Sequence, residues 1–297
     1  MSNNRTKRWN QRDLAPWHFL APGILIFLIY VIMPIFQSVW ISFFEWDGLG
    51  PKTWVGLENY AYLLDDESFY TSLKNNIIWL VLYMLAIPAG LAVALFLNQT
   101  VAGIRLYKLL FFFPFVISQV VVGLIFSWFY APDFGILPKV LGALTGTEIA
   151  VLADDRFATY GIIAAGPWPQ IAYCMILYLT GLNNINPEQV EAARMDNAKG
   201  WSMLWNIIIP QLRPATFIAA VVTVIGALRS FDLISIMTVG GPYGSTRVLS
   251  NFMYEQALSE YGVAMGYGAA IAVVLFAIML VFITLFVVRM LAQERDS

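Results

Sequence analysis

Hydrophobic residues along the chain fall into six long runs separated by polar segments. Each run has the roughly 20 apolar residues that an α-helix needs to cross the hydrocarbon core of a bilayer. The runs lack the period-2 alternation typical of strands in a membrane barrel. The pattern predicts an all-α membrane protein with six transmembrane helices, over residues 18–44, 73–97, 107–130, 158–182, 214–239 and 263–290.

Composition supports this class and excludes others. Hydrophobic residues make up 59% of the chain and charged residues 12%, whereas a soluble domain is about 25% charged. The net charge of -2 and the lack of a basic patch give no reason to expect a nucleic-acid partner. The single cysteine, Cys174, excludes an intrachain disulfide, and the lone His18 cannot by itself build a histidine metal site.

Basic residues indicate the sidedness of the polar segments, because cytoplasmic segments carry an excess of lysine and arginine. With both termini in the cytoplasm, most of the 17 basic residues fall inside. We therefore expect a cytoplasmic segment at 1–17, a six-span domain at 18–290 with a cytoplasmic loop at 183–213, and a cytoplasmic tail at 291–297. The first apolar run is too long for a signal peptide and lacks a small-residue cleavage pattern, which favours an uncleaved span.

The first external segment, 45–72, is rich in aromatic residues. Tryptophan and tyrosine at this density are typical of the membrane–water interface. We favour an interfacial belt; a surface for an external partner is the alternative, and the two are compatible.

The loop at 183–213 is predicted to hold two short helices that lie along the membrane surface. Asn186 is a suitable N-cap, since Pro187 is tolerated at the first helical position and Glu188 suits the helix dipole. Gly200 predicts a turn, with a second helical piece at 201–209. Pro210 and Pro214 are expected to break the chain before the fifth span.

The spacing within this loop resembles the EAA loop of ATP-binding-cassette (ABC) importer permeases. That pattern is Glu-Ala-Ala, three residues, Gly, nine residues, Ile, one residue, Leu and Pro, and its counterparts here are Glu191, Ala192, Ala193, Asn197, Ile207, Ile209 and Pro210. Asn197 stands where glycine is usual and Ile209 where leucine is usual. Asparagine tolerates a left-handed backbone better than most residues, so Asn197 is expected to preserve the turn.

The resemblance implies that this segment docks into an ATPase subunit. Glu191 would then pair with a basic group of the ATPase, while Ala192 and Ala193 would allow close approach. Asp196 is expected to hydrogen-bond near the turn. The simpler interpretation is an amphipathic surface helix that only satisfies its own caps.

The run at 229–242, with Thr246 and Tyr254 after it, resembles the carbohydrate-uptake branch of these permeases, specifically the first permease subunit of maltose-type and glycerol-3-phosphate-type systems. This implies a type I ABC importer permease fold in the bacterial cytoplasmic (inner) membrane. The expected partners are a second homologous permease in a heterodimer, two ATPase subunits, a periplasmic or tethered solute-binding protein, membrane lipid and a sugar-type substrate. No cofactor is expected on this chain, because ATP and Mg²⁺ would bind the ATPase subunits.

The substrate path is expected near the middle of the fourth and fifth spans. Prolines and a glycine at 166–169 free backbone groups, which is tolerated only where protein or water satisfies them. By resemblance to the maltose-type permease, the candidate substrate-binding residues are Gly166, Trp168, Pro169, Gln170, Tyr173, Thr223, Ala227 and Ser230. Thr223, Ala227 and Ser230 would share one helical face. The alternative for the fourth span is a kinked helix with aromatic packing.

Arg229 and Asp232 are charges within a span, and such charges are functional candidates by default. Their i, i+3 spacing permits a mutual ion pair. The alternative is that Arg229 binds an anionic substrate.

Enzymatic functions have no support in the sequence. The phosphate-binding motif G-x-x-x-x-G-K-[ST] and the metalloprotease, hydrolase and dinucleotide motifs are absent, so this chain is not expected to be the ATPase. Two other transport functions stay open: an ABC permease for a non-sugar solute, and an ion-coupled secondary transporter. The latter is typically built from two similar halves, and the sequence shows no clear repeat.

Overall fold

The computed structural model describes residues 11–99, 102–146, 150–259 and 263–295. Residues 1–10 of the expected N-terminal segment and 296–297 of the expected tail lie outside the described residues. The described part is almost wholly helical, with one two-stranded antiparallel sheet.

Five stretches are long and apolar enough to span a membrane: Phe19–Ile41, Glu67–Leu97, Ala158–Asn183, Arg213–Met237 and Met265–Arg289. They confirm five of the six predicted spans. The second span begins six residues before the expected position. Its first helix starts at Glu67 because the Asp66 side chain caps it, accepting a hydrogen bond from the backbone N–H of Ser68 at 2.8 Å.

Most of these spans consist of more than one helical segment. The helices that build them are α1 (Gln11–Phe27), the π-helix η1 (Leu28–Ile32), α2 (Met33–Ile41), α4 (Glu67–Tyr83), α5 (Ala86–Leu97), α9 (Ala158–Ala165), α10 (Pro167–Asn183), α14 (Arg213–Leu228), α15 (Asp232–Met237) and α17 (Met265–Arg295).

The third predicted span, 107–130, is not a straight helix. The structure has α6 (Ile104–Val116) followed by α7 (Gln119–Phe129), with an angle of 98° between them. Ile117 is extended, and the Ser118 hydroxyl caps α7 by accepting from the N–H of Val121 at 3.4 Å. Together the two helices are long and apolar enough to count as a span, and they bend because a capping residue inside the apolar run starts a new helix.

Close packing of α10 along α5 forms one side of the helical bundle. A Cβ atom on Gly90 of α5 would lie 2.4 Å from the Cβ of Cys174 on α10, far inside the 3.5–4.0 Å of an ordinary carbon contact. Glycine at this position therefore allows the two helices to approach. The bundle continues through α14, which contacts α4, α10 and α17.

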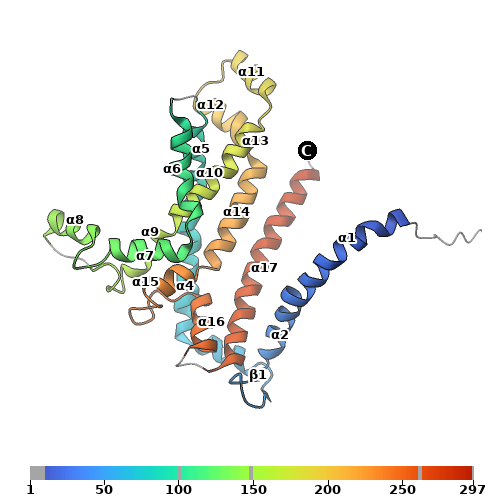
Figure 1. Ribbon diagram of the computed structural model, residues 1–297, viewed down its shortest axis with the longest axis vertical. Coiled ribbons are helices and arrows are strands. Elements are labelled where there is room, and N and C mark those ends of the chain that lie inside the picture. The colour runs from blue at the N-terminus through green and yellow to red at the C-terminus, as the bar shows by residue number, and fades with distance from the viewer. Residues whose placement is uncertain (1–10, 100–101, 147–149, 260–262, 296–297) are drawn as a thin grey trace, which may run out of the picture.

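One end of the molecule carries the sheet, and the opposite end carries the helices of the 183–213 loop (Figure 1). The strands β1 (Phe44–Glu45) and β2 (Thr53–Trp54) form a hairpin, followed by α3 (Glu58–Asp65). The short helix α8 (Ile136–Thr145) projects to one side, and α16 (Leu249–Leu258) packs against α17 near the hairpin end.

The hairpin turn is organised by one carboxylate. The Asp47 side chain accepts hydrogen bonds from the backbone N–H groups of Gly50 at 2.7 Å and Leu49 at 2.9 Å, and these bonds hold the pKa of Asp47 below its usual value. Aromatic rings of this region pack together, with Trp54 against Trp40, Phe43 and Phe44.

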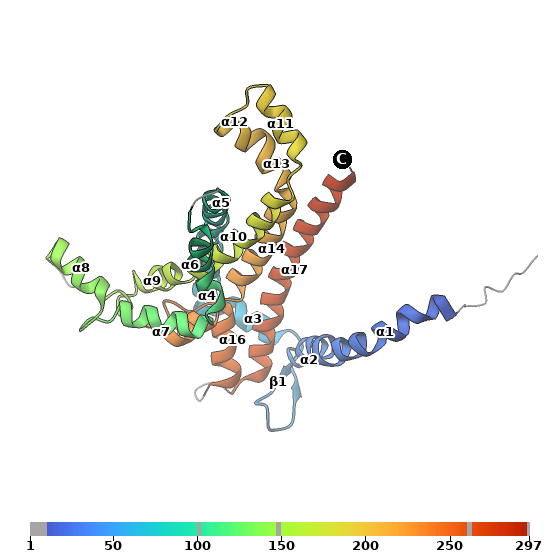
Figure 2. The same ribbon diagram turned by 45° about the horizontal axis from the view of Figure 1, so that its top comes forward.

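The first span extends away from the other helices as an arm (Figures 1 and 2). Within Phe19–Ile41 none of the residues in its most apolar window is buried. The α2 part packs on α17. The apolar surface of this arm is therefore free for lipid or for another membrane protein.

Candidate substrate cavity and coupling loop

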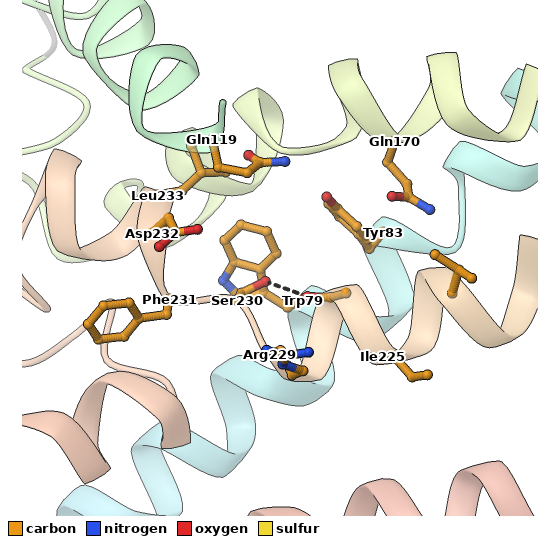
Figure 3. A pocket seen from close by; sticks show the side chains of 12 residues that line it. Trp79, Tyr83, Gln119, Gln170, Ile225, Arg229, Ser230, Phe231, Asp232 and Leu233 are labelled. Atoms are coloured by element: carbon orange, nitrogen blue, oxygen red, sulfur yellow. Dashed lines mark hydrogen bonds between the residues drawn. The ribbon is translucent and has the colours of Figure 1, made fainter. Parts of the chain in front are cut away.

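A cavity of about 340 Å³ lies where five helical segments meet (Figure 3). Its walls come from α4, the start of α7, α10, the end of α14 and the start of α15. The lining residues are Trp79, Tyr83, Gln119, Gln170, Val222, Ile225, Gly226, Arg229, Ser230, Phe231, Asp232 and Leu233. Aromatic, amide, hydroxyl and charged groups thus converge on one space, as in pockets for polar small molecules.

Two residues that lie one turn apart on α4 form the aromatic wall of the cavity. Trp79 and Tyr83 are four residues apart, and their ring centroids are 5.8 Å from each other. The Tyr83 hydroxyl donates to the Gly166 carbonyl at 3.2 Å. A Cβ on Gly166 would lie within about 3 Å of both rings, so this glycine allows α4 to pack directly against the junction of α9 and α10.

The wall on the α10 side is a small polar network. The Gln170 amide donates to the Thr223 hydroxyl of α14 at 2.8 Å. Cys174, one turn further along α10, lies 3.8 Å from the same hydroxyl. Thr223 is fully buried, so it orients Gln170 without lining the cavity itself.

The polar end of the cavity exists because α14 stops at Leu228. Arg229 and Ser230 lie between α14 and α15, and the Ser230 hydroxyl bonds back to the Gly226 carbonyl at 3.2 Å. The buried Asn76 of α4 stabilises this break: its amide donates to the Leu228 carbonyl at 3.3 Å and accepts from the N–H of Leu249 at 2.8 Å. Ser230 is therefore not on the helical face that the i, i+7 spacing predicted, because the helix ends two residues earlier.

The charged residues do not form the ion pair that their spacing permits. The ion pairs within the described residues are Arg156–Asp154 and Arg247–Glu255. The side chains of Arg229 and Asp232 are exposed, and neither makes an ion pair or hydrogen bond to the described part of the chain. Both line the cavity (Figure 3). The mutual ion pair is therefore wrong for this structure.

Three of the sequence-predicted residues line the cavity: Gln170, Arg229 and Ser230. Gly166, Pro169, Thr223 and Ala227 are buried beside it. Trp168 packs against Phe126, with ring centroids 6.1 Å apart, and Tyr173 packs against Phe115 at 5.6 Å. Those two rings contact other aromatic side chains and lie outside the lining.

Sequence analysis missed Trp79, Tyr83 and Gln119 as members of this site. Two signals were present. The adjacent amides Asn75 and Asn76 mark α4 as a span with a polar face, and Ser118-Gln119 interrupts an apolar run. Each buried polar group in a span needs a partner, so each indicated a place where the chain does more than face lipid.

The 183–213 loop forms the helix–turn–helix that its sequence predicts. The first helix is α11 (Pro187–Met195), and the Asn186 side chain caps it by accepting from the N–H of Glu188 at 2.9 Å. Asn197 has φ +62°, the left-handed conformation expected where glycine is usual. Gly200, at φ +53°, precedes the second piece. That piece comprises α12 (Trp201–Met203), the π-helix η2 (Leu204–Ile208) and α13 (Ile209–Gln211).

Two expectations for the loop need correction. Pro210 does not break the chain: the helical run that begins at Trp201 continues through it to Gln211, and the break comes at Leu212. Pro214 lies in the first turn of α14. The Asp196 side chain makes no hydrogen bond to the described residues; only its backbone N–H is bonded, to the Ala192 and Arg194 carbonyls.

Large apolar side chains of the loop point outward. Met195 is 87% exposed, Trp201 73% and Trp205 60%. Glu191 and Ala192 are exposed as well, whereas Ala193 is buried and Ile207 and Pro210 are half-buried. An exposed apolar patch beside an unpaired carboxylate is typical of a protein-interaction surface.

The base of the loop is tied to the spans on either side. The Gln211 side chain accepts from the N–H of Asn186 at 3.1 Å and donates to the Ile207 carbonyl at 3.2 Å. Further along the same two spans, the Tyr178 hydroxyl of α10 donates to the Thr216 hydroxyl of α14 at 3.1 Å. The same two helices supply Gln170 and Gly226 to the cavity, so the loop and the cavity share their supports.

Comparison with known proteins agrees with these features. Residues 86–296 match the family described as "Binding-protein-dependent transport system inner membrane component". The probable ABC transporter permease protein YurN of Bacillus subtilis is 36% identical over 91% of this chain and 94% of its own length. The alpha-glucoside transport system permease protein AglF of Rhizobium meliloti is 31% identical over 95% of this chain and 84% of its own.

A further relative is the sn-glycerol-3-phosphate transport system permease protein UgpA of Agrobacterium fabrum, 31% identical over 90% of this chain and 91% of its own length. Among solved structures, a chain of a bacterial ABC transporter involved in the import of the acidic polysaccharide alginate superposes with a TM-score of 0.77 at 24% identity. The match covers 93% of this chain and 96% of that one. It shows that the fold is the same.

The fold and the match define the class of protein: a multi-pass inner-membrane permease subunit of an ABC transporter, which is not itself an enzyme. Within that class, the chain belongs to the family of inner-membrane components of binding-protein-dependent transport systems.

Proposed function

We propose that this permease translocates a sugar, an oligosaccharide or a sugar or polyol derivative that a solute-binding protein delivers from outside. The observation that carries the proposal is the cavity itself. It combines the aromatic rings of Trp79 and Tyr83 with the amides of Gln119 and Gln170 and the hydroxyl of Ser230. Amides and hydroxyls bond sugar hydroxyls, and the two largely buried rings supply an apolar wall behind them.

The names of several relatives support a carbohydrate. They include an alpha-glucoside permease, the multiple sugar-binding transport system permease protein MsmF of Streptococcus mutans and a probable permease for starch degradation products. Trp168 and Tyr173 keep their proposed role only if the cavity extends toward them during transport, because their rings pack on Phe126 and Phe115 here.

In this proposal, transport is driven by ATP hydrolysis in a pair of ATPase subunits that dock on the loop around 191–210. The exposed Glu191 and the apolar patch of Met195, Trp201 and Trp205 supply the contact surface. The left-handed turn at Asn197, which follows α11 and fixes the direction of the chain before the second helical piece, supports this use. Closure of the ATPases would pull on α10 and α14, the two helices that also carry cavity residues. ATP and Mg²⁺ would bind the ATPases and not this chain.

Docking of the ATPases requires the loop to be cytoplasmic. We propose that both termini and the 183–213 loop face the cytoplasm, as the distribution of basic residues indicates, and that the hairpin end faces the binding protein. The arm over Phe19–Ile41 is the proposed contact with a second, homologous permease, because none of the residues in its most apolar window is buried within the described chain.

Reconstitution tests this function. The permease would be assembled in liposomes with its partner permease, ATPase and binding protein, and uptake of labelled sugars measured with and without ATP. In Glu191→Lys we expect uptake and ATPase co-purification to fall more than about tenfold, since unpairing a buried interfacial charge costs about 2–5 kcal/mol and 1.4 kcal/mol is a factor of ten.

A matched control is Glu58→Lys, a charge reversal at an exposed position at the start of α3, the helix that follows the hairpin in the chain. It should leave ATPase co-purification unchanged. Sugar uptake driven by an ion gradient without the ATPase, or full coupling in Glu191→Lys, would contradict the proposal.

A further inference from the structure

The cavity holds one positive and one negative side chain, and both are free. Arg229 and Asp232 are the charged residues among the twelve that line it. Within the described residues neither has an oppositely charged partner or a side-chain hydrogen bond. An unpaired charge within a span is costly unless water or a ligand satisfies it. This cavity therefore offers a guanidinium and a carboxylate to whatever occupies it.

The two charges come from different sides of one short break. Arg229 follows the last residue of α14, and Asp232 begins α15. In the view of Figure 3, the Trp79 ring lies between the two labelled side chains. A ligand in this cavity would therefore meet both a donor group, the guanidinium, and an acceptor group, the carboxylate.

The remaining polar groups of the cavity are uncharged. The indole N–H of Trp79 and the amide oxygen of Gln119 are buried and have no hydrogen-bond partner among the described residues. With Gln170 and Ser230 they form a set of neutral donors and acceptors. Such groups match hydroxyls, each of which both donates and accepts.

We propose that Arg229 and Asp232 act together to select an electrically neutral, polyhydroxylated cargo, a sugar or polyol with adjacent hydroxyl groups, and to exclude anionic sugars. The guanidinium donates to one or two hydroxyl oxygens, and the carboxylate accepts from neighbouring hydroxyls. A carboxylated or phosphorylated sugar gains attraction from Arg229 but meets repulsion from Asp232 in the same space. This inference rests on the proposed function and names the class of cargo.

The names of relatives do not decide this question. They include an alpha-glucoside permease and an sn-glycerol-3-phosphate permease, and the matching structure belongs to an importer of an acidic polysaccharide. The cavity of this chain differs from a simple anion site by the presence of Asp232 beside Arg229.

The test measures binding to the assembled permease–ATPase complex in nanodiscs without the binding protein, so that the binding protein's own selectivity is absent. Saturation-transfer NMR would compare a panel of uncharged disaccharides with the matching disaccharides that carry a uronic acid. The wild-type complex should prefer the uncharged members. Asp232→Asn should raise the affinity for the anionic members by about tenfold, equivalent to about 1.4 kcal/mol.

Two further variants separate selection from structure. Arg229→Gln should weaken the uncharged ligands by about tenfold without admitting anionic ones. The double variant Arg229→Gln with Asp232→Asn should bind weakly with no preference by charge. The control Asp133→Asn removes an exposed carboxylate outside the cavity lining and should leave the preference unchanged.

An unchanged anionic-to-neutral ratio in Asp232→Asn, with uncharged sugars still bound, would overturn this inference and leave the sugar permease standing. A wild-type preference for anionic sugars, or for zwitterions over sugars, would overturn it as well. Absence of binding by any carbohydrate in the panel would instead overturn the sugar function, and the inference with it.

Discussion

At the scale of single residues, buried amides determine where the cavity forms. Asn75 donates to the carbonyls of Ser245 at 2.7 Å and Arg247 at 2.8 Å, while Asn76 bonds Leu228 and Leu249. These bonds satisfy backbone groups that the end of α14 and the loop before α16 leave unpaired. Two adjacent side chains of α4 thus stabilise the non-helical segment between α14 and α15 and the loop before α16.

We predict that Asn76→Leu destabilises the protein. Leucine is similar in size but cannot hydrogen-bond, so the Leu228 carbonyl and the Leu249 N–H would lose the bonds that the Asn76 amide makes to them. Each such group costs about 1–3 kcal/mol when buried. The midpoint of thermal unfolding in detergent should fall, and hydrogen exchange at Leu249 should accelerate. Asn98→Leu, at an exposed position after α5, is the matched control and should change neither measurement. Equal unfolding midpoints for the two variants would refute the role of Asn76.

At the scale of elements, the bundle depends on the close approach of α5 and α10 and on the broken third span. The break between α6 and α7 turns the chain through 98° and brings Gln119 to the cavity. A straight third span would carry Gln119 mid-helix. The coupling loop is closed by a single hydrogen bond, from the backbone N–H of Asn186 to the side chain of Gln211, 25 residues further along the chain.

We expect Gly90→Ala to destabilise the packing of α5 on α10 by about 1–3 kcal/mol, the usual cost of overpacking. Its new Cβ would meet Cys174 at 2.4 Å and the backbone nitrogen of Met175 at 3.0 Å. The buried thiol of Cys174 should become reactive toward a maleimide as the helices separate. Gly23→Ala is the control: nothing lies within 4 Å of its Cβ, so higher helix propensity should make it neutral or slightly stabilising. Matching thiol reactivity in both variants would argue against this packing.

At the scale of the whole molecule, α7 and α15, which contribute to the cavity, lie between the hairpin end and the coupling loop, and the arm of the first span extends away from both (Figures 1 and 2). This arrangement is typical of a subunit of a larger membrane complex. Its loop, its arm and its hairpin end each present surface that the described residues do not cover, and the cavity is supported by the same helices that hold the loop.

We predict that a photoreactive amino acid at Tyr30, which is 75% exposed on the arm, crosslinks to the partner permease in the assembled complex. Ile26 lies one turn away on the same face and should give the same product. The variants expressed without the partner permease provide the control and should give no such product. Crosslinks to lipid alone in the assembled complex would show that the arm faces the bilayer.

Much of this protein is determined by local sequence. Spans are set by the length and apolarity of each run, because lipid requires every backbone group to be satisfied within its own helix. Five spans, the cap at Asn186 and the left-handed turn at Asn197 follow from such local rules. The family resemblance of the coupling loop was also visible, since its spacing lies within one continuous segment.

The composition of the cavity was decided only by tertiary structure. Trp79, Gln119 and Asp232 come from separate elements, and their meeting depends on a 98° break and on the end of α14. Sequence spacing allowed Arg229 and Asp232 to pair, and the non-helical residues between them left both unpaired within the described chain. Local rules describe how one segment forms its own backbone hydrogen bonds, caps and turns. Which side chains share a cavity depends on how segments far apart in the chain pack against one another, and no single segment contains that information.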